Sequence, residues 1–461
     1  MSARPYRNYL LVVLMVILAF NYVDRLALGL LLQDIKADIG LTDTQLGVLS
    51  GIAFALFYSV MGIPIARWAD RGNRVVIITV TTALWSVAVA LCGAAGSFLQ
   101  LLIIRVGVAV GEAGCIPPAH SLIADYFSRK ERPRAVAIYM LGAPVSMIVG
   151  YLIAGWLNEV YGWRMTFVLL GLPGVVLALL AWTTLRDPRY GGVAGTLERV
   201  PEPARGSEGG AAELSVREVC VALWRMPTFR HLLLCFSVVS FFGYGLLQWQ
   251  PAFFVRSHGL QTGELGTWFA LITGGGGLLG TYLGGEWASR RAAGNERLQL
   301  RAIAVMYCTF SGISACMYLA SDYRVAFTLM AVATVGIYSV TGPLFATIQT
   351  LVSARMRAMS IAILYLFGNL VGMGFGPLAA GVLSDAFRPW AGEESLRYAL
   401  LVLCPGYVWA AAHLWLASRS VASDLAHDTD LTEGTVSGDG RADLPHARPN
   451  VSDANAVEPA Q

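Results

Sequence analysis

Long apolar stretches recur along the whole chain and leave little choice of fold. A helix needs about 20 predominantly apolar residues to cross a bilayer, and the 461-residue sequence contains twelve such stretches. The sequence therefore predicts an all-α integral membrane protein with twelve transmembrane helices. The expected spans are residues 9–33, 45–66, 75–95, 98–122, 133–157, 164–185, 230–254, 263–288, 301–320, 324–349, 357–384 and 397–418.

The composition agrees with this prediction and excludes several classes of protein. Charged residues make up only 14% of the chain, against about 25% in an average soluble domain. The only lysines, Lys36 and Lys130, lie outside any glycine-rich phosphate loop, which argues against an ATP-driven pump. The seven cysteines form no CxxC motif and the six histidines lack metal-ligand spacing. We therefore expect no metal and no cofactor. The net charge of +3 is small and does not itself bear on nucleic acid, and we expect no nucleic-acid partner.

The distribution of Lys and Arg between the spans predicts the orientation. If both termini face the cytoplasm, the short cytoplasmic loops and flanks hold sixteen of these residues and the external loops hold six. Cytoplasmic loops of membrane proteins carry such an excess of positive charge. We therefore expect a multi-pass protein of the cell (inner) membrane with both termini in the cytoplasm.

One long internal loop divides the spans into two sets of six. The expected domains are an N-terminal six-helix bundle, a cytoplasmic linker, a C-terminal six-helix bundle and a cytoplasmic tail, at residues 1–185, 186–229, 230–418 and 419–461.

The linker and the tail have distinct sequence characters. In the linker, Ser215 and Glu218 form a capping box that predicts a short surface helix over about 215–225. Residues 420–461 carry eight acids and two bases with few large apolar groups, so we expect a disordered tail.

Several spans contain runs of glycine or proline. Residues 274–277 are all glycine, and residues 372–377 read GMGFGP. Such runs allow close packing and bending of membrane helices. Pro117 and Pro118 are expected to kink the span at 98–122.

A cation-rich signature follows the second span and recurs after the eighth. Residues 66–74 read ARWADRGNR, and residues 285–291 read GEWASRR at an offset of 219 positions. The repeat indicates that the two halves of the chain are duplicated units.

The signature has the chemistry of a gate at the cytoplasmic ends of the helices. We expect Asp70 to pair with an arginine, and Arg71 and Arg74 to hold helix C-termini or lipid phosphates. In the second copy, Ser289 stands at the position of Asp70, and Arg290 follows it. A serine cannot form an ion pair, so the second copy should connect neighbouring helices more weakly. The alternative is that these cations only flank a membrane span.

Several motifs resemble one known family. The twelve spans and the 66–74 signature are similar to the major facilitator superfamily. Residues 21–25 read NYVDR, residues 105–113 read RVGVAVGEA, and Asn73 stands where most members carry glycine. These details resemble the Spinster branch of the superfamily, over about residues 5–420.

The resemblance implies a fold and a class of function. It implies two pseudo-symmetric six-helix bundles, with the first and fourth spans lining a central cavity. Animal members of the Spinster branch export sphingosine-1-phosphate or lysophospholipids. The arginine-rich composition and compact loops suggest a bacterial relative, which we expect to be a monomer.

Four charged residues lie deep in the predicted spans of the N-terminal half: Asp24, Arg25, Arg105 and Glu112. Charges in a bilayer cost at least about 2.5–3.5 kcal/mol each, so they indicate function. Arg105 and Glu112 are seven residues apart and share one helix face. The depths predict that Asp24 meets Arg105 and that Arg25 meets Glu112. The alternative is a static polar cluster that only fixes helix packing.

Different roles are expected for the acids and the arginines. A desolvated carboxylic acid can titrate near neutral pH, whereas an arginine stays charged. Asp24 is the first candidate for the proton carrier and Glu112 the second. Arg25 and Arg105 are expected to bind the cargo, because a guanidinium binds phosphate oxygens bidentately.

The C-terminal half should supply the other wall of the cavity. Its candidate substrate contacts are Tyr244, Gln248, Tyr338 and Thr341, among strongly apolar neighbours. The alternative for each is an ordinary hydrogen bond between helices.

These features predict a proton-coupled secondary transporter of lysolipid-like or sphingolipid-like amphiphiles that works by alternating access. Its expected partners are such a small molecule, protons and membrane lipids. A multidrug or organic-anion/proton exchanger and an uncoupled lipid facilitator remain alternatives. An enzyme is disfavoured, because the spans contain no Ser/His/Asp set, metal cluster or His–acid pair.

Overall fold

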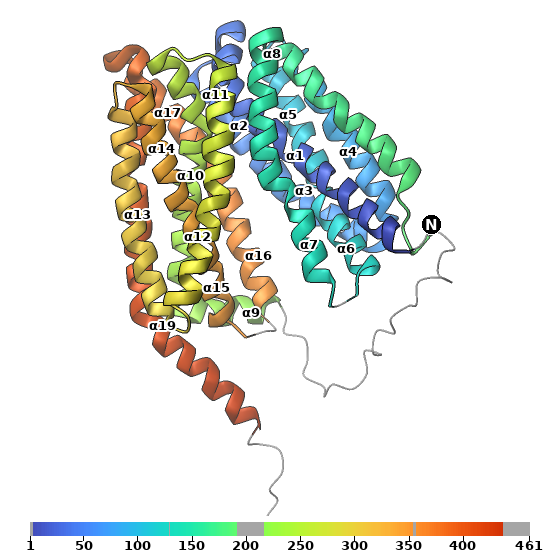
Figure 1. The fold of residues 1–461 in the computed structure, drawn as a ribbon, viewed down its shortest axis with the longest axis vertical. Helices are drawn as coiled ribbons and strands as arrows, with labels where there is room; N and C mark the ends of the chain where they lie inside the picture. The colour runs from blue at the N-terminus through green and yellow to red at the C-terminus, as the bar shows by residue number, and fades with distance from the viewer. Residues whose placement is uncertain (1–2, 129, 191–215, 354–355, 437–461) are drawn as a thin grey trace, which may run out of the picture.

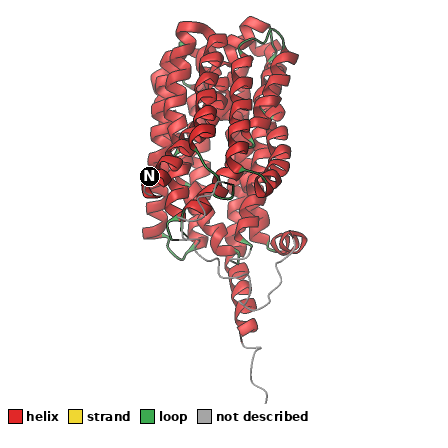
Figure 2. Cartoon of the chain, turned by 90° about the vertical axis from the view of Figure 1, so that its right-hand side faces the viewer, coloured by secondary structure: helices red, strands yellow, loops and turns green. Residues whose placement is uncertain are grey.

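The computed structural model describes residues 3–128, 130–190, 216–353 and 356–436. These residues form helices joined by short turns, and this part of the chain contains no strand (Figure 2). The helices build two bundles that stand side by side (Figure 1).

Eight helices form the N-terminal bundle: α1 (Ala3–Ile39), α2 (Asp43–Ser50), α3 (Ile52–Arg71), α4 (Arg74–Cys92), α5 (Phe98–Glu112), α6 (Ile116–Tyr126), α7 (Arg132–Met140) and α8 (Gly142–Thr184). The long helix α8 is two segments joined at Gly162, whose φ of 74° is left-handed. Glycine adopts this conformation without a steric penalty, so the chain reverses there.

After a short helix α9 (Val216–Arg225), the remaining elements form the C-terminal bundle. They are α10 (Pro227–His258), α11 (Thr262–Phe269), η2 (Ala270–Gly275), α12 (Gly276–Arg291), α13 (Glu296–Leu319), α14 (Tyr323–Ser339), α15 (Thr341–Leu351), α16 (Arg357–Phe367), η3 (Gly368–Phe375), α17 (Gly376–Ala391), η4 (Gly392–Glu394), α18 (Ser395–Leu403) and α19 (Gly406–Val436).

Nine helical stretches of the described residues are long and apolar enough to cross a membrane. Two of them, Arg132–Thr184 and Met359–Leu425, each contain two of the spans expected from the sequence. The expected span at 263–288, which forms α11, η2 and α12, is not among the nine. The membrane-spanning all-α fold is therefore confirmed, and the count of twelve stays a prediction.

The two bundles pack against each other at one end of the molecule. We call this the Asp43 end, and we call the opposite end, where α9 lies, the linker end. Helix α2 packs on α17, α8 on α11 and η2, and α3 on η3. Glycine allows these contacts: a Cβ on Gly47 would lie 2.7 Å from the carbonyl oxygen of Pro377. Towards the linker end, α6 and α7 diverge from α15 and α16 (Figure 1).

Both glycine-rich stretches of the C-terminal bundle begin within a π-helical segment. Segment η2 covers 270–275 and contacts α8, and η3 covers 368–375 and contacts α3. The sequence predicted bending here but not the π form. Single-turn π segments in α-helices are frequent at functional sites, and these two lie where one bundle meets the other.

The proline pair ends a helix instead of kinking it. Helix α5 stops at Glu112, and α6 restarts at Ile116 with Pro117 and Pro118 in its first turn. Proline suits the first helical turn, because its missing N–H would have no partner there. The expected kink is therefore a break just after Glu112.

The ends of the C-terminal bundle agree only in part with the sequence prediction. Helix α9 coincides with the expected surface helix, although Ser215 lies outside the described residues. The disordered tail expected from residue 420 is wrong at its start, because α19 continues to Val436. Asp424 accepts a hydrogen bond from the backbone N–H of Thr228 at 2.9 Å, so polar residues of the tail cap α10. Residues 437–461 are outside the described part.

Candidate functional site

Two ion pairs join α1 to α5 within the N-terminal bundle, as the sequence predicted. The Nη1 atom of Arg105 lies 2.7 Å from Oδ2 of Asp24. The Nε atom of Arg25 donates to Oε2 of Glu112 at 2.7 Å, and its Nη2 atom lies 2.5 Å from the same oxygen. We call these four residues the Asp24 cluster.

The members of the Asp24 cluster differ in their access to solvent. The side chains of Asp24, Arg105 and Glu112 are at most 2% exposed, whereas that of Arg25 is 17% exposed. Arg25 also lies within electrostatic range of Tyr244 on α10, in the other bundle. Arg25 is therefore the member that faces the region between the bundles.

Three aromatic rings surround the guanidinium of Arg25. Its Cζ atom lies 4.4 Å from the ring centroid of Phe54, and 4.9 Å from those of Tyr22 and Tyr58. The faces of aromatic rings attract cations. The rings thus hold the guanidinium in place while leaving part of it accessible. The sequence analysis missed this aromatic cage, whose rings come from both α1 and α3.

Each acid of the Asp24 cluster keeps one oxygen free. Oδ1 of Asp24 and Oε1 of Glu112 are buried and have no hydrogen-bond partner among the described residues. The two acids also lie close enough to interact electrostatically. Each acid therefore has one buried oxygen that an added proton could occupy.

The residues expected from the C-terminal half have different surroundings. Tyr244 is 39% exposed and lies near Arg25, whereas the hydroxyl of Tyr338 approaches Sδ of Met147 at 3.8 Å. Gln248 packs against the backbone of Gly29 in the contact between α10 and α1. Thr341 is exposed at the start of α15. Tyr244 lies within electrostatic range of Arg25, and Tyr338 lies within that range of Tyr244.

The signature residues at the linker end are mostly exposed. The side chain of Asp70 has no ion-pair partner among the described residues, and its carbonyl accepts from Arg189 at 3.1 Å. The Ser289 hydroxyl donates to the carbonyl of Glu286 at 3.1 Å, and Arg290 pairs with the Glu286 carboxylate. In this conformation no hydrogen bond or ion pair between described residues joins the signature residues to the other bundle.

Arg71 and Arg74 have different environments. Arg71 is exposed, and its carbonyl accepts from the hydroxyl of Tyr190. Arg74 is fully buried, so the expectation that it meets lipid phosphates is wrong. It donates to both oxygens of Asp187, at 2.5 and 3.0 Å, and to the carbonyl of Ser121 at 2.9 Å.

The Arg74–Asp187 pair joins the start of α4 to the chain that leaves α8. Burial raises the pKa of Asp187, but the hydrogen bonds from Arg74 outweigh it and leave that pKa lowered. The backbone N–H of Arg74 also donates to Asp187, at 2.8 Å. Arg74 therefore stabilises the N-terminal bundle internally.

An ion pair between the two bundles lies at the Asp43 end. Asp43 at the start of α2 is fully buried and accepts from Arg256 of α10 with both oxygens. Lys36 and the hydroxyl of Ser384 bind the same carboxylate, each at 2.6 Å. We call these four residues the Asp43 cluster.

A second acid also connects the two bundles at the Asp43 end. Asp385 of α17 accepts from the backbone N–H groups of Asp43 and Thr44, at 3.1 and 2.7 Å, and so caps α2. Negative charge at a helix N-terminus is stabilising. The sequence analysis missed this junction, because Asp43 and Asp385 lie at the ends of spans, where charges are common.

Two helical bundles that meet at one end and diverge at the other, with buried ion pairs beside the junction, define a membrane transport protein. No group of three metal-ligating side chains occurs in the part of the chain that the structure describes. The chain belongs to the Major Facilitator Superfamily, whose sequence profile matches residues 14–377.

Individual relatives indicate which branch of the superfamily this chain resembles. An MFS-type efflux pump of Mycolicibacterium smegmatis is 33% identical over 417 residues, which cover 90% of this chain and 94% of that one. Protein spinster homolog 1 of Xenopus laevis is 25% identical, over 85% and 77% of the two chains. A bacterial homologue of the human lysosomal transporter Spinster, in its inward-facing and occupied conformation, is 31% identical with a TM-score of 0.78, over 91% and 98%. The resemblance to the Spinster branch is thus confirmed.

Proposed function

We propose that this protein is a proton-coupled secondary transporter of lysolipid-like or sphingolipid-like amphiphiles. The observation that carries the proposal is the Asp24 cluster, in which two acids and two arginines are buried in one bundle. The chain's relatives are transporters, which favours transport over catalysis.

We also propose that the linker end faces the cytoplasm. The excess of Lys and Arg in the loops at that end supports this orientation. The bundles meet at the Asp43 end, so the conformation is then inward-facing, like that of the structural neighbour. Asp70 and the second signature would meet partners only when the linker end closes.

Proton binding is assigned to the two acids. With both acids ionised, each arginine is neutralised by one carboxylate. A proton on Asp24, the first candidate, or on Glu112, the second, would neutralise that acid and weaken its hold on the paired arginine. The proton thereby makes a guanidinium available to an anionic cargo.

Arg25 is assigned to the head group of the cargo. It is the most exposed member of the cluster, and its aromatic cage offers apolar faces beside the charge. Arg105 is covered and bound to Asp24, so we assign it a supporting part in binding. Tyr244 lies opposite and completes the polar part of the site.

A multidrug or organic-anion/proton exchanger is the second candidate. The relative described as an efflux pump favours it, because that chain is matched over almost its whole length. An arginine that binds a phosphate also binds a carboxylate. The two candidates share a proton site and differ in the tail that the cargo carries.

Transport into proteoliposomes tests the proposal. Fluorescent lysophospholipid should accumulate in response to a pH gradient, and Asp24→Asn should abolish this accumulation while downhill exchange persists. Asp38→Asn is the matched control, because Asp38 lies on the same helix but pairs with Arg164 at the surface.

Two outcomes would contradict the assignments. Accumulation of substrate by Asp24→Asn at the rate of the unaltered protein would remove Asp24 as the proton carrier and leave Glu112. Uptake of small organic anions without any uptake of lysophospholipid would favour the exchanger.

A further inference from the structure

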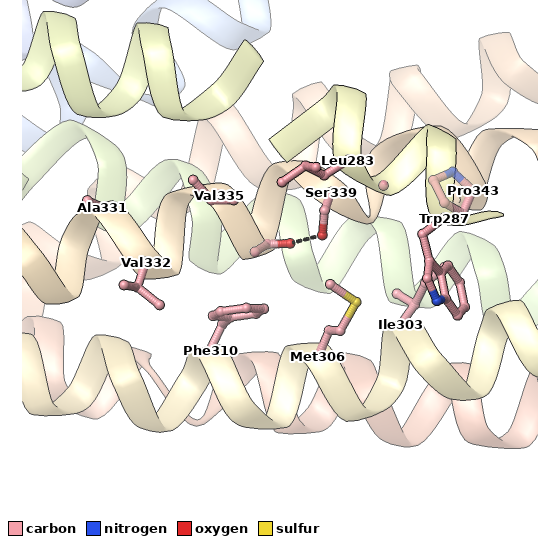
Figure 3. A pocket seen from close by; sticks show the side chains of 12 residues that line it. Leu283, Trp287, Ile303, Met306, Phe310, Ala331, Val332, Val335, Ser339 and Pro343 are labelled. Carbon is pink, nitrogen blue, oxygen red and sulfur yellow. Dashed lines mark hydrogen bonds between the residues drawn. The ribbon is translucent and has the colours of Figure 1, made fainter. Parts of the chain in front are cut away.

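An apolar groove of about 620 Å³ lies on the C-terminal bundle, away from the Asp24 cluster. Ligand pockets commonly have volumes of about 300–1,000 Å³. Helices α12, α13 and α14 form its walls, and their side chains point into it (Figure 3). The residues that the argument uses are Leu283, Trp287, Phe310, Val332, Gly336 and Ser339.

Small residues create this groove. Gly336 lies directly against the ring of Phe310, which a Cβ at that position would strike. Gly284 lies against the carbonyl group of Ser339 in the same way. The helices therefore approach closely at two points and leave an unfilled space beside them.

The groove offers almost no polar surface. The hydroxyl of Ser339 donates to the carbonyl of Gly336 at 2.7 Å, so it is already satisfied (Figure 3). Water needs two to four polar partners to occupy a cavity, and the other side chains offer few. An unfilled apolar space also forfeits dispersion contacts, so hydrocarbon is its most favourable occupant.

The rim of the groove is open at the side of the bundle. Leu283 is 46% exposed and Val332 is 49% exposed. Both residues belong to helices in the predicted spans, so this side meets the bilayer. A lipid chain can therefore enter without passing between the bundles.

Two arginines lie beyond the groove, on the side towards the linker end. Arg290 and Arg291 follow Trp287 by three and four residues on α12, so they share its helix face. Arg290 already pairs with Glu286, whereas Arg291 is exposed. The indole N–H of Trp287 has no hydrogen-bond partner within the described ranges, and indoles commonly lie at the level of lipid head groups.

We propose that the groove binds one acyl chain of an anionic membrane phospholipid, whose phosphate lies against Arg291 and the indole N–H of Trp287. The lipid is a bound component of the bilayer and not the cargo. The groove lies away from the Asp24 cluster, and lipid binding there does not depend on the proposed function. Trp287 and Arg291 also belong to the second copy of the cation-rich signature.

Native mass spectrometry of the purified, delipidated protein, titrated with 1-palmitoyl-2-oleoyl-phosphatidylglycerol, tests the proposal. Val332→Trp fills the groove and should weaken binding of the tightest lipid about tenfold, because it excludes several methylene groups. Val325→Trp is the matched control, because Val325 is also about half exposed on α14 but does not line the groove. Equal binding by the two variants would overturn the proposal.

A second variant tests the head group and does not disturb the groove. Arg291→Gln should abolish the preference for phosphatidylglycerol over phosphatidylcholine, while the chain still binds. An unchanged preference would overturn the assignment of the phosphate to Arg291. If Val332→Trp bound phosphatidylglycerol normally but lost transport, the groove would belong to the cargo and the lipid proposal would be wrong.

Discussion

The guanidinium of Arg256 binds both oxygens of Asp43, at 2.7 and 2.5 Å, and this bidentate pair connects the two bundles. Asp43 is fully buried and the side chain of Arg256 is 6% exposed. Lys36 brings a second cation to the same carboxylate. The contact that holds the Asp43 end closed thus depends on one acid between two cations.

Asp43→Asn should release the Asp43 end. Removing one partner of a buried pair costs roughly 3–5 kcal/mol, and here it leaves Arg256 facing Lys36. Because moving a two-state equilibrium from 1:99 to 99:1 takes about 5.5 kcal/mol, the substitution should strongly reduce the described conformation. Spin-label distances between α7 and α16 at the linker end should shorten.

The control for this experiment is Asp38→Asn. Asp38 pairs with Arg164 near the same end, but both residues belong to the N-terminal bundle and are nearly half exposed. Its distance distribution should match that of the unaltered protein. If Asp43→Asn gave this same distribution, the pair would not hold the bundles together.

Gly266→Ala should act on the same equilibrium through sterics. A Cβ at Gly266 would overlap the carbonyl group of Tyr151, where α11 packs on α8. Gly312→Ala is the matched control, since no atom lies within 4 Å of the added carbon. The linker-end distances should shorten in the first variant only. Equal distances would mean that the helices adjust without separating.

Arg25→Lys should weaken recognition of a phosphate-bearing cargo. The ammonium keeps the charge but loses the planar fork and its stacking against Phe54 and Tyr58. We expect KM to rise roughly tenfold for a lysophospholipid, with little change for an uncharged analogue of equal chain length. Arg324→Lys, which changes a surface arginine that contacts Tyr323, controls for the substitution itself. An equal change in KM for both ligands would contradict this role of Arg25.

Asp187→Asn should destabilise the N-terminal bundle in a pH-dependent manner. The folded-state pKa of Asp187 is lowered, so its contribution is present above the unfolded pKa of about 3.9 and is lost as pH falls below it. At neutral pH the variant should unfold at a clearly lower temperature, whereas below about pH 4 the difference should narrow.

Asp125→Asn is the control for Asp187. Asp125 pairs with the same Arg74 at 2.7 Å, but its side chain is 37% exposed. A partly exposed pair contributes less than a buried one, so the unfolding temperature should fall less. A larger effect from Asp125 would show that the pair with Asp187 is not the main stabilising contact.

The sequence predicted the Asp24 cluster, because its ion pairs follow from the positions of charges within individual spans. Charges are rare in membrane spans, so four of them had few possible partners. The seven-residue spacing of Arg105 and Glu112 fixed their common face, and the span directions fixed the order of depth. The aromatic cage escaped notice, because aromatic residues are ordinary in membrane helices and only the packing of α3 on α5 brings Phe54 to the cluster.

The Asp43 cluster and the Arg74 pair could not be predicted in the same way. Arg256 and Asp43 are 213 residues apart, and Arg74 and Asp187 are 113 apart. Each of these residues lies near the end of a helix, where positive-inside flanking or a loop charge explains it equally well. The partner of each residue depends on how distant helices are oriented relative to one another. The pattern of apolar residues along the chain does not contain this information.

The confinement of the four deep charges to one bundle has an electrical consequence. With both acids ionised, the Asp24 cluster has no net charge and can change its depth in the membrane field without electrical work. One bound proton makes it +1, and a full crossing of that charge is worth about 2.3 kcal/mol per 100 mV. The proton-loaded half of the cycle is then the voltage-dependent one. A cargo with one negative charge would cancel this dependence, so the response of transport to membrane potential reports the charge of what is carried.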